Sequence, residues 1–362
     1  RSGIAENMYS MIYLWMGPVR GGLAMGTVLI CTIVAAMTGI SGTAAVTMGI
    51  IALPSMLNRK YDKKLAMGSI MAGAALGPLI PPSVIFIVYG MYAEVSVGRL
   101  FAGGIFPGLL LSALFCIYIA TRSFLQKDLA PALPREERGT WKQKFVSLKS
   151  VILPALLILL VLGSIFTGAA TPTEAAGVGA LGALICALLT RRLTWEILKE
   201  SSFRSVRTSA MSIWILFGAT TFASVYTALG GGQMVTDFVG GLDISKWTII
   251  IGMQVSLVFL GCFLDALSIL MITVPVFLPI IKAIGFDPVW YGVVFCVNME
   301  LAYLTPPFGF NLFYMRGVAP KNITMGDIYR SVVAFLPLQL IGLILVIVFP
   351  KIILWFPDAI FG

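Results

Sequence analysis

The sequence predicts an all-α polytopic membrane protein that contains an inverted repeat and two re-entrant helical hairpins. Three observations support this fold class. Of the 362 residues, 59% are apolar and 11% are charged, whereas soluble domains carry about 25% charged residues. Apolar runs of about 20 residues, the length that crosses a bilayer as a helix, follow one another along the chain. A hairpin followed by a proline-interrupted helix occurs twice.

Seven apolar runs have roughly the length of a membrane-spanning helix. Two longer stretches, 22–57 and 247–281, are interrupted near the middle, so each half is too short to cross a bilayer comfortably. Both stretches are therefore expected to be re-entrant hairpins, whose broken backbone must lie against protein or a wet cavity. The seven runs lie at 65–92, 101–121, 151–167, 172–190, 208–229, 289–315 and 331–350.

The formal net charge of +9 lies between the apolar runs, which is typical of cytoplasmic loops and not of a nucleic-acid-binding face. If hairpin 22–57 opens to the cytoplasm and hairpin 247–281 to the opposite side, 20 of the 25 Lys and Arg residues are cytoplasmic. This asymmetry supports the topology. Two full crossings in place of each hairpin would give the same parity, and the short halves favour re-entrance.

Composition and motifs exclude several kinds of chemistry. The chain has no histidine, and its five cysteines are single residues inside apolar runs, so a transition-metal centre is not expected. No GxxxxGK[ST] motif occurs, so the chain does not hydrolyse ATP through a P-loop. An intramembrane aspartyl protease built on Asp265 would need a second acid at the same depth, for which only Glu300 is available. An enzyme is therefore not predicted.

The repeat consists of a hairpin tip and a broken helix. The first tip is GISGTAAVT, at Gly39–Thr47, and the first break is GPLIPPS, at Gly77–Ser83. The second tip is GCFLDALS, at Gly261–Ser268, and the second break is LTPPFGFN, at Leu304–Asn311. Because the two units enter from opposite sides, they form an inverted repeat. Interrupted segments at corresponding places of such repeats indicate a transporter binding site.

The breaks predict two sodium sites. A Pro-Pro pair inside a membrane helix removes two N–H donors and frees carbonyl groups of the preceding turn. Such carbonyls, together with hydroxyls and a carboxylate, are hard oxygen ligands. The first site is expected to combine Ser41, Gly42 and Thr43 with Pro81 and Pro82, and the second to combine Asp265 and Ser268 with Thr305 and Pro306.

The helices that start after the breaks predict a binding site for an organic anion. Their N-termini direct free N–H groups and the positive ends of their dipoles toward one cavity. The residues expected around this anion are Ala44, Ser83, Pro307, Gly309 and Asn311. Small residues such as Gly68, Gly73 and Gly77 also serve close helix packing without any ligand, but two such units in inverted orientation favour the binding interpretation.

Three acidic residues in apolar surroundings receive different interpretations. Asp265 is expected to face a cavity and to bind a cation rather than to carry a proton. Glu300 is interpreted either as a coupling residue or as a group hydrogen-bonded to a neighbouring helix, and the structural role is favoured. Glu174 is expected to close a capping box with Thr171, with Pro172 at the first helical position.

At these motifs the sequence resembles the large membrane subunit of the tripartite ATP-independent periplasmic (TRAP) transporters. The matching segments lie at 21–46, 77–83, 166–180, 261–280 and 298–320. The resemblance implies an elevator-type, sodium-coupled importer in the bacterial inner membrane. It also implies an organic acid substrate, a carboxylate or sulfonate, delivered by a periplasmic substrate-binding protein, and a small four-helix membrane subunit as partner.

The resemblance also suggests a division of the chain. Family members usually begin with further hydrophobic segments ahead of the position of Arg1, so part of the scaffold is expected to lie outside this sequence. The expected parts are an interfacial arm with partial scaffold at 1–20, a first transport repeat at 21–99, scaffold and connecting helices at 100–230, a second transport repeat at 231–318 and a C-terminal scaffold helix at 319–362.

Two alternatives remain open at this point. A proton-coupled organic-anion permease would work without a binding protein, with Asp265 or Glu300 carrying the proton. A structural scaffold would need neither break, so replacing Pro82 and Pro307 with alanine would barely affect it but would impair a carrier. The identity of the organic acid does not follow from the sequence.

Overall fold

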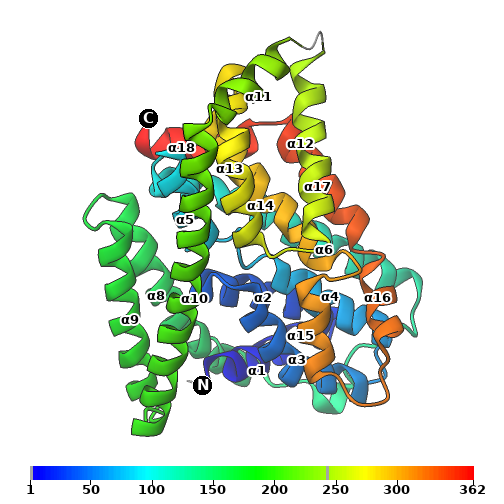
Figure 1. The fold of residues 1–362 in the computed structure, drawn as a ribbon. Coiled ribbons are helices and arrows are strands. Elements are labelled where there is room, and N and C mark those ends of the chain that lie inside the picture. Colours follow the sequence, from blue (N-terminus) through cyan, green and yellow to red (C-terminus); the bar gives the residue numbers. More distant parts are fainter. Residues whose placement is uncertain (1–2, 242–243) are drawn as a thin grey trace.

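The computed structural model describes residues 3–241 and 244–362, and within these ranges it contains helices and turns but no strand (Figure 1). Six helical stretches in the described part are long and apolar enough to cross a membrane. The predicted all-α membrane fold is therefore confirmed. The chain begins with a short helix, α1 (Ile4–Met16), and ends with α18 (Lys351–Phe361).

Both predicted interruptions of the hairpins and both predicted helix breaks are present. In the first repeat the helices are α2 (Gly22–Thr38), α3 (Ser41–Asn58), α4 (Lys63–Ala75) and α5 (Val84–Ala93). The corresponding helices of the second repeat are α12 (Lys246–Gly261), α13 (Ala266–Ala283), α14 (Pro288–Leu304) and α15 (Phe310–Val318). Each hairpin and each broken helix thus consists of two short helices joined by non-helical backbone.

The two hairpins approach the centre of the molecule from opposite ends. In Figure 1 the pair α2 and α3 lies in the lower half and the pair α12 and α13 in the upper half. The repeats are interlocked, because α3 packs against α15 of the other repeat and α13 packs against α5. The second helix of each hairpin therefore contacts the part of the opposite broken helix that follows its break.

Helices α4 and α14, which occupy equivalent places in the two repeats, form the core. All residues of α4 from Leu65 to Ala75 are buried, and nearly all of α14 is buried. A helix that is apolar on every side is stable only when it is surrounded by other helices. Small residues make this possible: Gly73 contacts α2 at Val28 and Cys31, and Gly292 contacts the ring of Tyr89.

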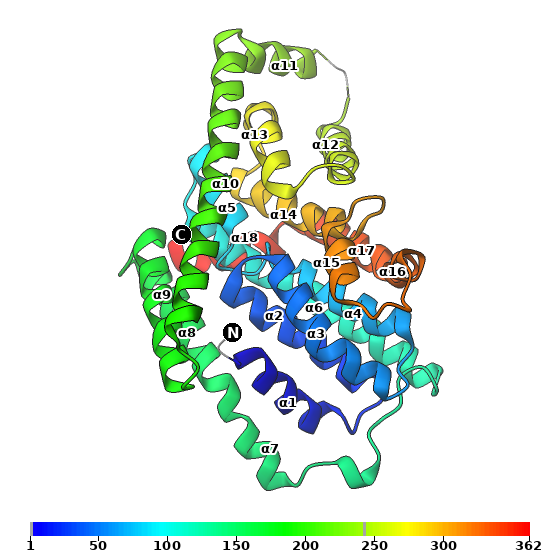
Figure 2. The same ribbon diagram turned by 60° about the horizontal axis from the view of Figure 1, so that its bottom comes forward.

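The connecting region lies to one side of this core. Helices α8 (Lys149–Phe166), α9 (Pro172–Leu189) and α10 (Trp195–Ala228) are mostly exposed and apolar, and Figures 1 and 2 show α8 and α9 at the edge of the molecule. The capping box predicted at the start of α9 is confirmed, because Thr171 Oγ1 accepts from the backbone N–H of Glu174 and Glu174 accepts from the Thr171 N–H. A short helix, α11 (Gly231–Gly240), leads from α10 toward the second hairpin.

The run predicted at 331–350 lies almost entirely within one helical stretch, Met325–Val348, that is long and apolar enough to cross a membrane. Turns divide the C-terminal segment into α16 (Met325–Val332), α17 (Leu336–Val348) and α18, and Pro337 and Pro350 lie at the starts of the last two, where proline favours a helix start over helix continuation. Both α17 and the long helix α6 (Val97–Leu125) pack directly against α14. The division into transport and scaffold parts stays a prediction, but these two helices, which are predicted to belong to the scaffold, share one core with the repeats.

The N-terminal arm is held by a polar cluster outside the membrane-spanning helices. Helix α1 buries Met8 and Ile12 against the first hairpin. At its end the Tyr13 hydroxyl donates to Glu137 Oε2 at 2.6 Å, and Arg59 donates to the same oxygen at 3.0 Å. Glu137 lies in a 3₁₀ turn, η1 (Arg135–Glu137), that precedes the short helix α7 (Trp141–Ser147). The cluster thus joins the arm, the first hairpin and the connecting loop.

Replacing Glu137 with Gln is expected to loosen α1. The Tyr13 hydroxyl and the Arg59 guanidinium hold the pKa of Glu137 below its ordinary value. Because the pKa of Glu137 is lower in the folded than in the unfolded protein, ionised Glu137 stabilises the fold at neutral pH. This stabilisation is lost as the pH falls through the lowered pKa. The protection factors of α1 amides, which correct for the intrinsic pH dependence of hydrogen exchange, should therefore be lower in E137Q at neutral pH and should fall less on acidification. E136Q, which alters the neighbouring exposed carboxylate, should leave both unchanged; equal effects of the two substitutions would contradict the assignment.

Candidate functional site

The first hairpin tip is wedged into the first helix break. A Cβ at Gly77 would lie 2.7 Å from the backbone nitrogen of Ser41 and 2.9 Å from the carbonyl carbon of Ile40. On the other side of the tip, a Cβ at Gly39 would collide with the carbonyl oxygen of Pro82. Glycine at both positions therefore lets the two stretches of irregular backbone approach each other directly. The structure thus brings Ser41 close to the break, as the first predicted sodium site requires.

A chain of hydrogen bonds joins this tip to the second repeat. The Ser41 hydroxyl donates to Asn311 Oδ1 at 2.5 Å, and Asn311 Nδ2 donates to the carbonyl of Met71 on α4 at 3.0 Å. All three groups are buried. Next to Ser41, Gly42 lies against the ring of Tyr314 on α15. The tip of the first hairpin and the second broken helix therefore form one polar junction.

The second hairpin tip is organised by a carboxylate. Asp265 caps α13 by accepting from the backbone N–H groups of Leu267 and Ser268 at 3.0 and 3.1 Å, and the Ser268 hydroxyl donates to its other oxygen at 2.5 Å. At the first residue of this tip, Gly261 packs against Ala302 on α14. Asp265 is half-buried. Its orientation is thus set by the start of its own helix.

A cavity of about 270 Å³ lies where the two repeats meet. It is bordered by the first residues of four helices, each of which directly follows one of the four interruptions. These residues are Gly39–Gly42 at α3, Val84 and Ile85 at α5, Asp265 and Leu267 at α13, and Phe310 and Tyr314 at α15. The four half-helix starts thus border one cavity, whereas the binding of an anion by their N–H groups stays a prediction. Helices α3 and α15 start without a side-chain cap, so their first N–H groups are free of such partners.

One wall of the cavity was not predicted from the sequence. Helix α10 contributes Thr208, Met211, Ser212 and Ile215, and α14 contributes Tyr303. The available signal was the pair of hydroxyl residues at 208 and 212, four apart on one face of an apolar helix. Such hydroxyls usually bond to their own helix, as Ser212 does to the carbonyl of Thr208, so the signal alone did not indicate a site.

The predicted sodium ligands fall into two groups. Ser41, Gly42 and Asp265 border the cavity. Thr43 is exposed and lines a different cavity, between the first hairpin and α1. Ser268 bonds to Asp265, as described above. The roles of these residues in ion binding stay predictions.

The two breaks share a proline geometry, and two side-chain hydrogen bonds are found at the second break. Both Pro81–Pro82 and Pro306–Pro307 are cis peptide bonds. The Thr305 hydroxyl donates to the carbonyl of Leu301 at 2.7 Å, and Tyr329 donates to the carbonyl of Pro307 at 3.1 Å. The two breaks thus resemble each other in backbone geometry, which supports the repeat.

The five residues predicted to bind the substrate are not among the described residues that line the cavity. Ser83 is buried, donates to the carbonyl of Pro78 and caps α5. Ala44 is fully buried in α3, and Asn311 is engaged with Ser41 and Met71. Gly309, with a φ of +42°, forms the turn into α15, and Pro307 is exposed beside it. Their contact with a substrate stays a prediction.

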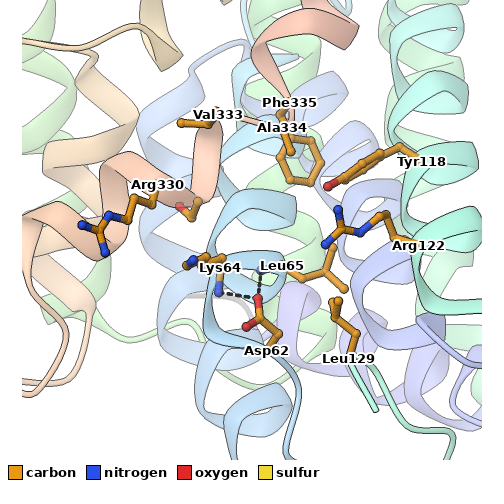
Figure 3. Close-up of a pocket in the computed structure, with 11 residues that line it drawn as sticks. Asp62, Lys64, Leu65, Tyr118, Arg122, Leu129, Arg330, Val333, Ala334 and Phe335 are labelled. Atoms are coloured by element: carbon orange, nitrogen blue, oxygen red, sulfur yellow. Dashed lines mark hydrogen bonds between the residues drawn. The ribbon is translucent and has the colours of Figure 1, made fainter. Parts of the chain in front are cut away.

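A second cavity, of about 220 Å³, lies at the opposite end of α4, away from the breaks. Figure 3 shows Asp62 at its base, where its carboxylate accepts from the backbone N–H groups of Lys64 and Leu65. Arg122 and Arg330 lie on opposite sides of it. The Asp62 carboxylate is thus engaged in capping α4, and none of the residues predicted to bind sodium or substrate lines this cavity.

Comparison with known proteins places the chain among transporter components. A family model described as "Tripartite ATP-independent periplasmic transporter, DctM component" matches residues 1–352. The C4-dicarboxylate TRAP transporter large permease protein DctM of Pseudomonas aeruginosa is 32% identical over 357 residues, which cover 98% of this chain and 82% of that protein. The sialic acid TRAP transporter large permease protein SiaM of Vibrio cholerae is 32% identical over 368 residues, covering 100% and 83%.

A further relative and two solved structures extend this comparison. The isethionate TRAP transporter permease protein DctMQ of Oleidesulfovibrio alaskensis is 32% identical over 359 residues, which cover 98% of this chain and 55% of that protein. The YdaH transporter of Alcanivorax borkumensis has a TM-score of 0.65 at 16% identity, over 96% of this chain and 83% of that one. MtrF of Neisseria gonorrhoeae has a TM-score of 0.60 at 14% identity, over 93% and 79%. At these identities the two structures support the fold alone.

Replacing Gly77 with Ala is expected to destabilise the protein, because the added methyl group would push the first hairpin tip away from its break. Overpacking of this kind costs about 1–3 kcal/mol, which should appear as a lower melting temperature of the purified protein. Gly163 in α8 is a matched control, since a Cβ there meets nothing within 4 Å and Gly→Ala inside a helix is favourable by about 0.5–1 kcal/mol. A G77A melting temperature equal to or above that of the unsubstituted protein would show that the tip is not tightly packed.

Proposed function

We propose that this chain, which belongs to the DctM family of TRAP transporter large permeases, imports an organic acid by sodium-coupled secondary transport. In this proposal it is the large membrane subunit of a bacterial inner-membrane transporter. It takes its substrate from a periplasmic binding protein and moves it by an elevator mechanism. The observation that carries the proposal is the cavity bordered by the starts of four half-helices.

The cavity suits an organic anion. Free N–H groups at a helix N-terminus, together with the positive end of the helix dipole, attract negative charge. Helices α3 and α15 present such uncapped ends, and Ser41, Thr208 and Ser212 add hydroxyl groups on two sides. Apolar and aromatic side chains such as Phe310, Tyr303 and Met211 complete the wall. A carboxylate or sulfonate with a small carbon skeleton fits this combination.

Sodium is proposed to bind where each tip meets a break. At the first site Ser41 and Gly42 are proposed to combine with the carbonyl groups of Pro81 and Pro82, and the contacts of Gly39 with the Pro82 carbonyl and of Gly77 with the Ser41 backbone support this closeness. At the second site Asp265 and Ser268 are proposed to combine with the Thr305–Pro306 backbone, and the packing of Gly261 against Ala302 brings this hairpin next to the helix that leads into the break. A cation bound beside Asp265 would offset the negative charge of this carboxylate, which would otherwise repel an anion in the cavity.

The names of the relatives support an acidic or zwitterionic substrate but no particular one. They include permeases named for C4-dicarboxylates, sialic acid, isethionate and ectoine. The first three are carboxylates or a sulfonate, so the substrate is proposed at the level of an organic acid.

Two protein partners follow from the same family. TRAP transporters combine a large permease with a small membrane subunit and a periplasmic binding protein, and the relative named DctMQ carries a fused designation. The exposed apolar faces of α8, α9 and α10 are the proposed contact region for lipid and for the small subunit. Their apolar character suits either surrounding.

The energetics of two coupled sodium ions are sufficient for accumulation. Two ions crossing about 100 mV with a tenfold gradient release about 7 kcal/mol, and the import of one monoanion against the same potential costs about 2.3 kcal/mol. The difference corresponds to a gradient of between three and four orders of magnitude. Secondary transport therefore needs no further energy source.

The test is uptake of labelled organic acids into proteoliposomes that contain the chain, its small membrane subunit and the binding protein. Asp265→Asn removes the charge but keeps a residue that caps helices well, so the fold should persist. We expect a loss of sodium affinity of about tenfold or more, the size of one charge-assisted contact, with wild-type uptake in the exposed-loop control D128N.

Two outcomes would contradict the proposal. Equal uptake in potassium at an imposed pH gradient and without the binding protein would show a proton-coupled permease. An unchanged sodium dependence in D265N would remove Asp265 from the second ion site.

A further inference from the structure

A buried carboxyl group lies between two helices, away from the cavity. Glu300 on α14 is fully buried, and its Oε2 accepts a hydrogen bond of 2.7 Å from Nε2 of Gln339 on α17, which is also fully buried. The second hydrogen of Gln339 Nε2 is directed to the carbonyl of Val297. The donors of Gln339 are thus used completely.

Two acceptor atoms of this pair have no partner. Glu300 Oε1 and Gln339 Oε1 are both buried and receive no hydrogen bond in the described structure. A buried acceptor without a donor is costly, and a buried ionised carboxylate is stable only with an opposite charge or several donors. The ion pairs of the described residues involve other carboxylates, all of them at least partly exposed.

One proton resolves both deficiencies. If Glu300 Oε1 carries a proton, it becomes a hydrogen-bond donor. Its acceptor would be Gln339 Oε1, which has no other partner and belongs to the side chain that already donates to Glu300. We propose that Glu300 is a proton-binding site, and that as a neutral carboxylic acid it forms a double hydrogen bond with Gln339 that joins α14 to α17. The proton comes from a hydronium ion of the solvent: one of its O–H bonds breaks, an O–H bond forms at Oε1, the carboxylate changes from a charge of −1 to neutral, and a water molecule is released.

The surroundings favour a proton over a metal cation. Hard cations take about six or more oxygen ligands, whereas this site offers two free oxygens beside an N–H donor that would repel a cation. The titratable groups that interact with Glu300 are Cys296 and Tyr303, on its own helix. The pair is also supported nearby by Trp290, whose indole N–H donates to the carbonyl of Val346 on α17 at 3.2 Å.

The proposal makes this proton a structural one. It is retained while sodium and substrate bind elsewhere, and it connects α17 to the core helix of the second repeat. The site is thus independent of the proposed sodium coupling, and its tests do not need transport activity.

Infrared spectroscopy of the full chain in lipid tests the protonation directly. We expect the carbonyl band of a protonated carboxylic acid at neutral pH, unchanged when sodium replaces potassium, absent in E300Q and present in the exposed-surface control E196Q. In the exchanged variant E300Q/Q339E the band should return, because the acid and the amide have only changed places. A wild-type spectrum without this band, or a band that sodium abolishes, would overturn the proposal.

Thermal stability supplies a second measurement. E300Q keeps one donor and one acceptor toward Gln339, so its melting temperature should stay close to that of the wild type. E300L leaves the buried polar atoms of Gln339 without their partner and should lower the melting temperature by about 4 °C or more. If E300Q were as unstable as E300L, an ionised Glu300 would be required and the neutral acid would be ruled out.

Discussion

Irregular backbone at membrane depth must find its hydrogen-bond partners within the protein, and the centre of this structure is arranged around that requirement. The first hairpin tip is enclosed by Gly77 on one side and by Pro82 on the other. The helices that follow the interruptions at Ser83 and Asp265 are capped by those side chains. Each break is therefore stabilised by close packing or by a cap, and the space left between them is the cavity.

The cavity depends on both repeats at once. Helix α3 packs against α15 and α13 against α5, so each hairpin is placed by the broken helix of the other repeat. The hydrogen bond between Ser41 and Asn311 spans the same junction. Neither repeat alone contains a complete site. This interlocking also explains why α4 and α14 are so thoroughly buried, since each lies between its own hairpin and the opposite repeat.

Asp265 and Glu300 show how the surroundings separate two acids that resemble each other in the sequence. Both stand in apolar segments of the second repeat. Asp265 is half-buried, borders the cavity and directs its oxygens to the start of α13. Glu300 is fully buried between α14 and α17 with a single donor. The first position suits an exchangeable cation, whereas the second favours a group without charge.

The sequence by itself determined the apolar helices of membrane length, the four interruptions, the inverted repeat and the capping box at Thr171, because these features follow from local apolar length and from glycine, proline and capping residues. Only the tertiary structure decided which side chains face the cavity. Ser41 borders it while Thr43 faces α1, and the wall supplied by α10 has no local signature strong enough to predict it. The physical reason is that the cavity lining is set by packing between segments up to 270 positions apart in the chain, which no local pattern records.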